Sequence, residues 1–395
     1  MQTADPPNNT RNPESVPEIS PMEFASSLSA GDIVQVVDVR SPQRVAAGRI
    51  DLVPDAMFHN VPGSVLAAVQ GPFAIGIDPS IPVVVVCGHG NDSKIGAAML
   101  NRMGVSARSL SGGMASWMNL TVPRALPAPA ALDHLVQFDR IGKGALGYLL
   151  VSAGEAMVID PPRESDPYVK AAAESGARIV AVADTHVHAD YISGASALAR
   201  RLAIPYYLHS ADNVYPYDDS PGQLDIRPLR GGMSIRIGRA TVDVVHTPGH
   251  SPGSVTFRIG DGAVFTGDFL FVSSIGRPDI ADRTDEWSSL LWESIQSVMN
   301  TWPRDIVIYP AHYGSENERA AGGAVCAQFG DLLSRIPPLR MARESEFKDW
   351  IKRNISVVPA AYRTIKAINV GLRSAAERES EELEAGKNEC AIGGT

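Results

Sequence analysis

The sequence contains few cysteines, no excess of positive charge and no long apolar run. Its 3 cysteines among 395 residues are too few and too far apart for a disulfide framework, so we expect a protein of the reducing cytoplasm. Lys and Arg number 35 against 44 Asp and Glu, a net charge of −9, which argues against nucleic acid or an anionic membrane surface as the main partner. No segment approaches the roughly 18 apolar residues of a membrane span, and the polar N-terminal segment lacks the apolar core of a signal peptide.

The composition that remains is that of a globular protein of two or three domains, with 44% apolar and 20% charged residues. Strand-like and helix-like segments alternate up to about residue 122, which predicts a mostly parallel α/β domain. A Pro-rich stretch follows, and after it a strand-rich region. The last region is helical and ends in an acidic segment. We expect a disordered leader at 1–16, an α/β domain at 17–122, a linker at 123–132, a strand-rich domain at 133–330, a helical extension at 331–375 and a solvated acidic tail at 376–395.

Histidines and aspartates follow apolar strand-like runs at four places in the strand-rich region. Two sheets packed as a sandwich would bring such strand ends to one rim. Neutral imidazole and carboxylate donors without a thiolate suit zinc or iron, so these residues predict a metal site. Isolated histidines such as His59, His134 and His209 receive no role. The residues of the predicted site are His186, His188, Asp190, His250, Asp268 and His312.

The motifs THVHADY, TPGHSPGS, FTGD and YPAH, in this order, resemble those of the metallo-β-lactamase superfamily. The resemblance covers roughly residues 133–320. It implies an αββα sandwich with the metal site between the sheet edges. The superfamily contains both hydrolases and oxygenases, so the fold alone leaves the reaction open.

One position departs from the superfamily pattern H-x-H-x-D-H, because Tyr191 replaces the final His, which ligates a second metal. A phenol with a pKa of about 10 stays protonated at neutral pH and is a poor ligand. We therefore expect one metal, held by His186, His250 and Asp268, a set that leaves the open positions non-haem Fe(II) requires. His188 would then orient a ligand or water, whereas with zinc it would bind directly. Asp190, Tyr191 and His312 are expected to support the site or to act as alternative ligands.

The stretches THVHADYISG, FTGDFLFVSSIGRPD and YPAH resemble the persulfide dioxygenase (sulfur dioxygenase) branch more narrowly. This resemblance implies one Fe(II) per chain, held by the three residues named, that oxidises a persulfide such as glutathione persulfide with O2. It also assigns Arg277 to substrate binding, since a guanidinium clamps a carboxylate with two hydrogen bonds. The alternative for Arg277 is a salt bridge to Asp279 within its loop.

The N-terminal motifs VVDVR, AAGRI, VVVVCGHGNDS and LSGGMASWM resemble a single rhodanese (sulfurtransferase) domain. The resemblance makes Cys87 the candidate sulfur carrier, in a loop whose backbone N–H groups and following helix stabilise an anion. Asp92 replaces the Arg of the family loop and would raise the thiol pKa, which Lys94 or His89 would partly offset. Independent thiosulfate sulfurtransferase activity therefore stays open. Asp38 and Arg40 are expected to form an internal pair.

We thus expect a rhodanese-like domain fused to an iron-dependent persulfide dioxygenase, which releases sulfite and thiol in sulfide or persulfide detoxification and receives relayed sulfur. One alternative is a zinc hydrolase of a glutathione thioester, similar to glyoxalase II; another is a non-enzymatic persulfide or redox sensor. The expected partners are a low-molecular-weight thiol persulfide and O2, with no nucleic acid and no membrane, while a homo-oligomer stays open. Cys326 is expected in the core and Cys390 as a free thiol in the tail, both without a role.

Overall fold

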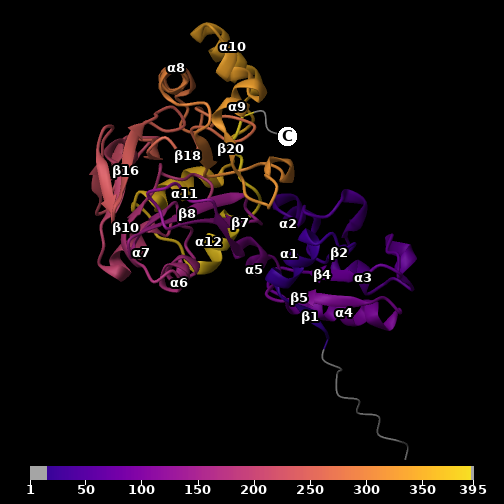
Figure 1. Ribbon diagram of the computed structural model, residues 1–395. Helices are drawn as coiled ribbons and strands as arrows, with labels where there is room; N and C mark the ends of the chain where they lie inside the picture. Colours follow the sequence, from indigo (N-terminus) through magenta and orange to yellow (C-terminus); the bar gives the residue numbers. More distant parts are fainter. Residues whose placement is uncertain (1–15, 393–395) are drawn as a thin grey trace, which may run out of the picture. The chain divides into compact units, whose positions relative to one another are not determined.

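The computed structural model describes residues 16–392, which divide into two compact units between Leu120 and Thr121 (Figure 1). Most of the predicted leader, residues 1–15, lies outside the described residues, while Val16 packs against the core of the first unit. No helix within the described range is long and apolar enough to cross a membrane.

The first unit is a five-stranded parallel sheet in the order β1-β5-β4-β2-β3, flanked by short helices. All four valines of the central strand β4 are buried, as expected for a parallel sheet covered on both faces. Its strands are β1 (Glu18–Ile19), β2 (Gln35–Asp38), β3 (Phe58–Asn60), β4 (Val83–Val86) and β5 (Ala107–Leu110). Its helices are α1 (Pro21–Ser29), α2 (Pro42–Ala47), α3 (Gly63–Leu66), α4 (Asn91–Arg102) and α5 (Gly113–Asn119), with 3₁₀ turns at Asp55–Met57 and Pro72–Ile75.

The second unit contains one sheet of seven strands and one of six, whose inner faces form a common apolar core. The first sheet, in spatial order, consists of β14 (Arg227–Leu229), β11 (Tyr206–His209), β10 (Arg178–Ala183), β9 (Glu155–Ile159), β8 (Ala145–Ser152), β7 (His134–Arg140) and β6 (Thr121–Leu126). The second consists of β15 (Ser234–Ile237), β16 (Ala240–His246), β17 (Val255–Ile259), β18 (Ala263–Gly267), β19 (Val307–Pro310) and β20 (Ala327–Gln328). A small hairpin pairs β12 (Val214–Tyr215) with β13 (Ser220–Pro221).

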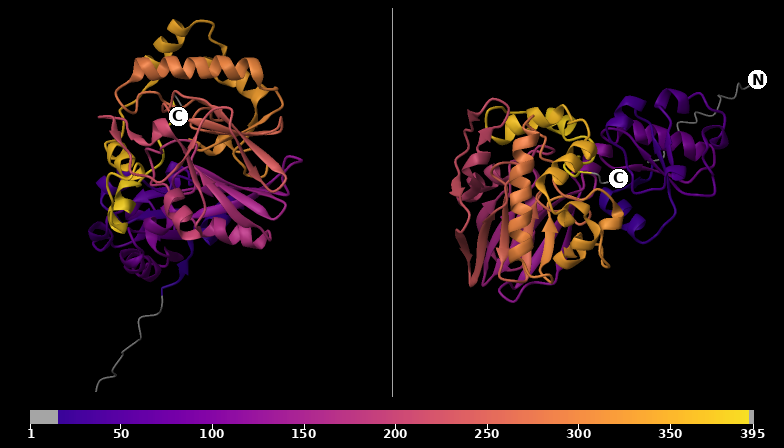
Figure 2. Two further views of the ribbon diagram at one scale, coloured as in Figure 1. Left: turned by 90° about the vertical axis from the view of Figure 1, so that its left-hand side faces the viewer. Right: turned by 90° about the horizontal axis from the view of Figure 1, so that it is seen from above.

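Helices cover the outer faces of both sheets, which gives the αββα layering expected from the sequence (Figure 2). Leu291, Ile295 and Val298 of the long helix α8 pack on the six-stranded sheet, and α6 and α7 pack on the seven-stranded one. The helices are α6 (Asp166–Glu174), α7 (Ala195–Leu202), α8 (Thr284–Thr301), α9 (Phe329–Arg335), α10 (Glu344–Asn354), α11 (Ala361–Asn369) and α12 (Glu377–Leu383). Single 3₁₀ turns lie at Ser210–Asp212, Glu316–Glu318 and Pro337–Arg340.

The Pro-rich segment predicted as a linker at 123–132 begins as sheet, which corrects that expectation. Strand β6 pairs antiparallel with β7 over its whole length, from Thr121 opposite Arg140 to Leu126 opposite Leu135. Pro123 is compatible with this pairing because β6 is the edge strand of its sheet, where a missing N–H can face away from the neighbour.

The acidic tail predicted to be solvated at 376–395 is helical at α12 and then packs against the second unit. Glu384 is 1% exposed, and its carboxylate contacts the guanidinium groups of Arg140 and Arg163. Cys390 and Ile392 are also buried. The composition of the tail concealed this docking, because the partners of its charges lie more than 200 residues away in the sequence.

Candidate metal centre

The predicted metal donors lie where strands of both sheets end. His186, His188 and Asp190 follow β10 of the seven-stranded sheet, whereas Asp268 directly follows β18 of the six-stranded sheet. Gly267 makes this approach possible: its φ is +55°, and a Cβ there would lie 2.4 Å from Thr185 Oγ1. The sandwich therefore brings residues far apart in the sequence to one rim.

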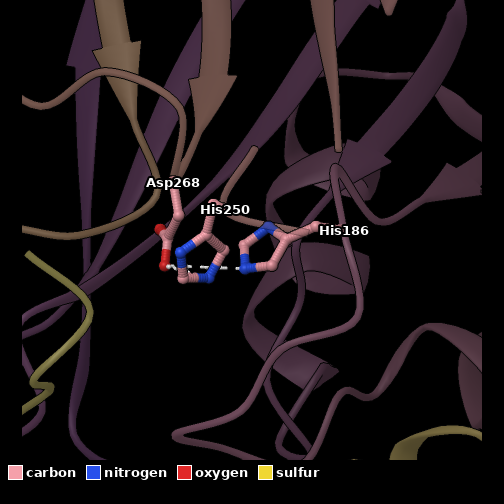
Figure 3. Close-up of side chains that lie close together, drawn as sticks. All are labelled: His186, His250 and Asp268. Carbon is pink, nitrogen blue, oxygen red and sulfur yellow. Dashed lines mark ion pairs between the residues drawn. The ribbon is translucent and has the colours of Figure 1, made fainter. Parts of the chain in front are cut away.

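His186, His250 and Asp268 form one buried donor group, with their side chains pointing toward one another (Figure 3). Asp268 Oδ2 lies 3.5 Å from both His186 Nε2 and His250 Nε2. None of these three atoms has a hydrogen-bond partner among the described residues. Buried polar atoms left unpaired in this way are costly, and a shared cation would satisfy all three, so the residues present fit a metal ion.

Hydrogen bonds on the far side of each imidazole turn its Nε2 toward this common point. His250 Nδ1 donates to the carbonyl of Arg277 at 2.9 Å. His186 Nδ1 lies 3.0 Å from Thr185 Oγ1, which itself donates to Asp160 Oδ2 at 2.9 Å and so accepts from the imidazole. Both bonds assign the proton to Nδ1 and leave Nε2 as a lone-pair donor.

The electrostatics of the donor group favour the protonation states that bind a cation. Burial lowers the pKa of both His186 and His250, which keeps the imidazoles neutral. Burial would raise the pKa of Asp268, but the neighbouring His312 and His186 outweigh it and hold that pKa well below its usual value. The group therefore offers two neutral nitrogens and one carboxylate.

His188, expected to support the site or to act as an alternative ligand, is not a member of this donor group, although its buried Nδ1 has no hydrogen-bond partner among the described residues. Its Nε2 lies 3.2 Å from Asp160 Oδ1 and 2.8 Å from the hydroxyl of Tyr191. Tyr191, which stands at the position of the missing histidine, is buried, and its phenol points to His188 and to the Asp160 carbonyl. The first donor group therefore contains two imidazoles and one carboxylate, without a third imidazole.

A second buried donor group consists of Asp190, His312 and Cys390. Cys390 had no predicted role. His312 Nε2 lies 3.0 Å from Asp190 Oδ2, and His312 Nδ1 lies 2.6 Å from Asp268 Oδ1, so the two groups adjoin. Burial opposes protonation of His312, but Asp190 and Asp268 outweigh it and raise its pKa to about 10. No motif marks Cys390, because only the folding of the tail brings it to the site.

Arg277, predicted to bind substrate, is 1% exposed and forms the alternative salt bridge to Asp279, with two contacts of 2.8 Å. Its other guanidinium nitrogen contacts Ser356 Oγ and the carbonyl of Glu389. Because these contacts and the Ser356 carbonyl use its donors, we assign Arg277 to the support of the tail and not to substrate binding.

In the first unit, Cys87 directly follows the buried strand β4, and its side chain is buried. Gly90 N–H donates to Cys87 Sγ at 3.1 Å, and Ser93 Oγ lies at 3.3 Å. Asp92 is exposed in the first turn of α4, while Lys94 pairs with Glu18 at 2.9 Å instead of facing the thiol. The expected pair of Asp38 and Arg40 is present.

Comparisons with known proteins agree with both halves of this description. Residues 20–120 match the rhodanese-like domain, and residues 142–315 match the metallo-beta-lactamase superfamily. The solved metallo-beta-lactamase of Staphylococcus aureus is 28% identical, with a TM-score of 0.55 over 62% of this chain and 74% of that one. The second unit therefore has the fold of a metallo-beta-lactamase superfamily domain. The chain joins a rhodanese-like domain to a domain of this superfamily.

Two curated relatives with different names each match part of the chain. The mitochondrial persulfide dioxygenase ETHE1 of Homo sapiens is 35% identical over 40% of this chain. A hydroxyacylglutathione hydrolase of Anaeromyxobacter dehalogenans is 34% identical over 35% of it. The chain spans 59% and 52% of the length of these two proteins.

Proposed function

We propose that the second unit is an iron-dependent dioxygenase that oxidises a low-molecular-weight persulfide, such as glutathione persulfide, to sulfite and thiol. The observation that carries this proposal is the composition of the first donor group, which consists of His186, His250 and Asp268, while His188 Nε2 contacts Asp160 and Tyr191. Two imidazoles and one carboxylate form the facial set of non-haem Fe(II) oxygenases, whereas a zinc site would recruit the third imidazole. The persulfide dioxygenase relatives support the same choice.

Fe(II) held by His186, His250 and Asp268 would supply open positions at which a persulfide and O2 are activated together. The protein residues then have three tasks. The Thr185 hydroxyl and the Arg277 carbonyl fix the orientation of the two imidazoles. His312 donates to Asp268 Oδ1 and keeps the other oxygen, Oδ2, facing the metal.

The third task is to exclude bulk water while admitting the persulfide. The metal-facing residues are all at most 1% exposed. A hollow reaches His312, and its wall includes Phe271 together with Asn388 and Ala391 of the tail. The tail thus forms one side of the hollow beside His312. The overall reaction converts one persulfide, one O2 and one water into one thiol, one sulfite and two protons.

The test combines elemental analysis of anaerobically purified protein with an oxygen electrode. The proposal predicts iron in the protein and oxygen uptake that depends on added glutathione persulfide, with sulfite and glutathione as products. Zinc without iron, and no persulfide-dependent uptake after iron reconstitution, would contradict it. We further propose that Cys87 carries sulfane sulfur toward this reaction in the cytoplasm.

The second candidate is a zinc hydrolase of a glutathione thioester, favoured by the hydroxyacylglutathione hydrolase relatives. Such a hydrolase would use its metal ions to activate water and to polarise the thioester carbonyl. It would therefore need donors for two adjacent ions, and not open positions on one ion for O2. The same preparation distinguishes the two candidates, because a hydrolase would cleave S-lactoylglutathione without oxygen, whereas the dioxygenase would leave this thioester intact.

A further inference from the structure

The structure points to a second cation site, which we propose is formed by Asp190, His312 and the tail thiol of Cys390. In this site the cysteine supplies the donor that the superfamily pattern lost when Tyr191 replaced its final histidine. One oxygen, one nitrogen and one sulfur donor suit a thiophilic divalent cation such as Zn²⁺. The site does not depend on which reaction the first site catalyses.

The geometry of the three donors supports this site. Their ligand atoms all lie within 4.8 Å of one another, and all three residues are at most 1% exposed. His312 Nε2 and Asp190 Oδ2 are 3.0 Å apart, and the thiol of Cys390 completes the group. Three buried donors that converge in this way are arranged as they would be around a shared ion.

The charge balance supports it as well. Neither carboxylate oxygen of Asp190 has a hydrogen-bond partner within residues 16–392, and the nearest ammonium group, that of Lys143, is 4.0 Å away. Cys390 Sγ lies 3.8 Å from the hydroxyl of Tyr362. The buried carboxylates of Asp190 and Asp268 share the single imidazole of His312, and a divalent cation would add the positive charge that a second carboxylate requires.

The tail holds Cys390 at this place through its backbone on both sides. Arg277 N–H donates to the Cys390 carbonyl at 2.9 Å, and Ala391 forms a β-bridge with Gly276. Glu389 N–H donates to the Tyr362 hydroxyl at 2.8 Å. Arg277 also accepts a hydrogen bond from His250 of the first donor group through its carbonyl. The fold of the domain therefore fixes the position of the Cys390 thiol.

Binding at this site would deprotonate the thiol. One Cys390 thiol and one Zn²⁺ would give a zinc–sulfur bond and one proton released to solvent, with no change of oxidation state. His312 would join the two sites, because its Nδ1 contacts Asp268 of the first group and its Nε2 faces Asp190 of the second.

The test uses the full chain, stripped of metal and then titrated with Zn²⁺ or Co²⁺. We expect two ions per chain, and with Co²⁺ a near-ultraviolet sulfur-to-cobalt charge-transfer band. Cys390→Ser should keep one ion, lose this band and bind the second ion about 100-fold more weakly, since even partners outside the ligand shell alter metal affinity by 10–100-fold.

Cys326→Ser is the matched control, because Cys326 is a half-buried cysteine of the same unit outside both donor groups. It should bind two ions and keep the band. The first ion retained by Cys390→Ser shows that the variant is folded at the rim. One ion in the unaltered protein, or a second ion and band unaffected in Cys390→Ser, would overturn the second site. Such a result would leave the proposed dioxygenase untouched, since that proposal fails only on persulfide-dependent oxygen uptake.

Discussion

At the scale of single residues, the chemistry of the rim depends on atoms that face away from the metal. The two imidazoles of the first donor group offer Nε2 because each Nδ1 has a fixed partner, the Thr185 hydroxyl or the Arg277 carbonyl. The sequence identified His186 and His250 from their places after strands. The hydrogen-bond partners of the two Nδ1 atoms could not be predicted from the sequence, because every residue has a backbone carbonyl.

Replacing Thr185 by Val should weaken metal binding at the first site. The change removes the acceptor of His186 Nδ1 and the donor to Asp160 Oδ2, so the imidazole loses its fixed orientation. We expect affinity to fall by roughly 10–100-fold, the usual cost of losing such a partner, measured by competition with a chelator. Thr185→Ser keeps the hydroxyl and should bind as tightly as the unaltered protein. Equal affinities for the Val and Ser variants would refute this account of His186.

Replacing Asp268 by Asn should remove the only carboxylate of the first donor group. The amide cannot supply the negative charge that faces both imidazoles, so we expect loss of the first ion and at least about 100-fold less persulfide-dependent oxygen uptake. Metal analysis and the oxygen electrode give the two measurements. Asp305→Asn, at an exposed site, is the control and should match the unaltered protein. Full iron content in Asp268→Asn would contradict the assignment.

At the scale of elements, the segment after α12 acts as a strap across the metal rim. It is fixed at one end by Glu384 with Arg140 and Arg163, and at the other by Ile392, whose N–H donates to the carbonyl of Ile275. An acidic, polar segment predicts solvation when its partners are unknown. The partners here come from β7 and from the loop after β9, so local sequence could not reveal them.

Glu384→Gln should loosen this strap and destabilise the protein by about 3 kcal/mol, because a neutral amide replaces the carboxylate that contacts the buried guanidinium of Arg140. Burial raises the pKa of Glu384, but Arg140 and Arg163 outweigh it and lower that pKa below the ordinary value of 4.5. A lowered carboxyl pKa stabilises the fold above the ordinary value, and this contribution is lost as pH falls through the lowered one.

Denaturant unfolding at neutral and acid pH would measure this effect, with proteolysis of the tail as a second readout. Glu384→Gln should lack the part of the acid destabilisation that this carboxylate causes. Glu382→Gln, which alters an exposed pair with Arg378, should behave as the unaltered protein. A tail equally resistant to protease in both variants would show that Glu384 does not hold the strap.

At the scale of the whole molecule, a rhodanese-like domain and a metallo-beta-lactamase superfamily domain share one chain. If Cys87 carries sulfur as proposed, this linkage would raise the effective concentration of that sulfur for the second unit. Asp92 weakens the case for thiosulfate as donor, since the loop lacks the guanidinium of the family pattern and Lys94 pairs with Glu18.

Cys87→Ser should therefore slow oxygen uptake several-fold when the persulfide donor is scarce, while metal content stays unchanged. A serine hydroxyl cannot carry sulfane sulfur, so only free persulfide would reach the iron. Uptake measured across a series of persulfide donors at limiting concentration tests this. Identical rates for the variant and the unaltered protein on every donor would remove the relay, and Cys326→Ser serves as the control.

The sequence predicted what depends on local pattern and missed what depends on distant contacts. The layered sandwich and the two buried donor groups could be predicted because each of the six metal-type residues lies at most seven positions after an apolar strand. The pairing of β6 was missed, since Pro123 suggested a linker and only an edge position makes it compatible with a strand. Cys390 was missed because its neighbours at the rim lie about 80 to 200 residues earlier.

The strap gives the metal rim an order of assembly. Arg140 and Glu384 are 244 positions apart in the sequence. The contact between Arg140 of β7 and Glu384 therefore forms only after nearly the entire second unit has been synthesised. A nascent chain can build the first donor group once His250 and Asp268 have been added, but it cannot enclose that group. An ion can therefore enter an open rim during synthesis and become trapped when the tail docks, which makes the timing of metal supply a determinant of which ion the mature protein holds.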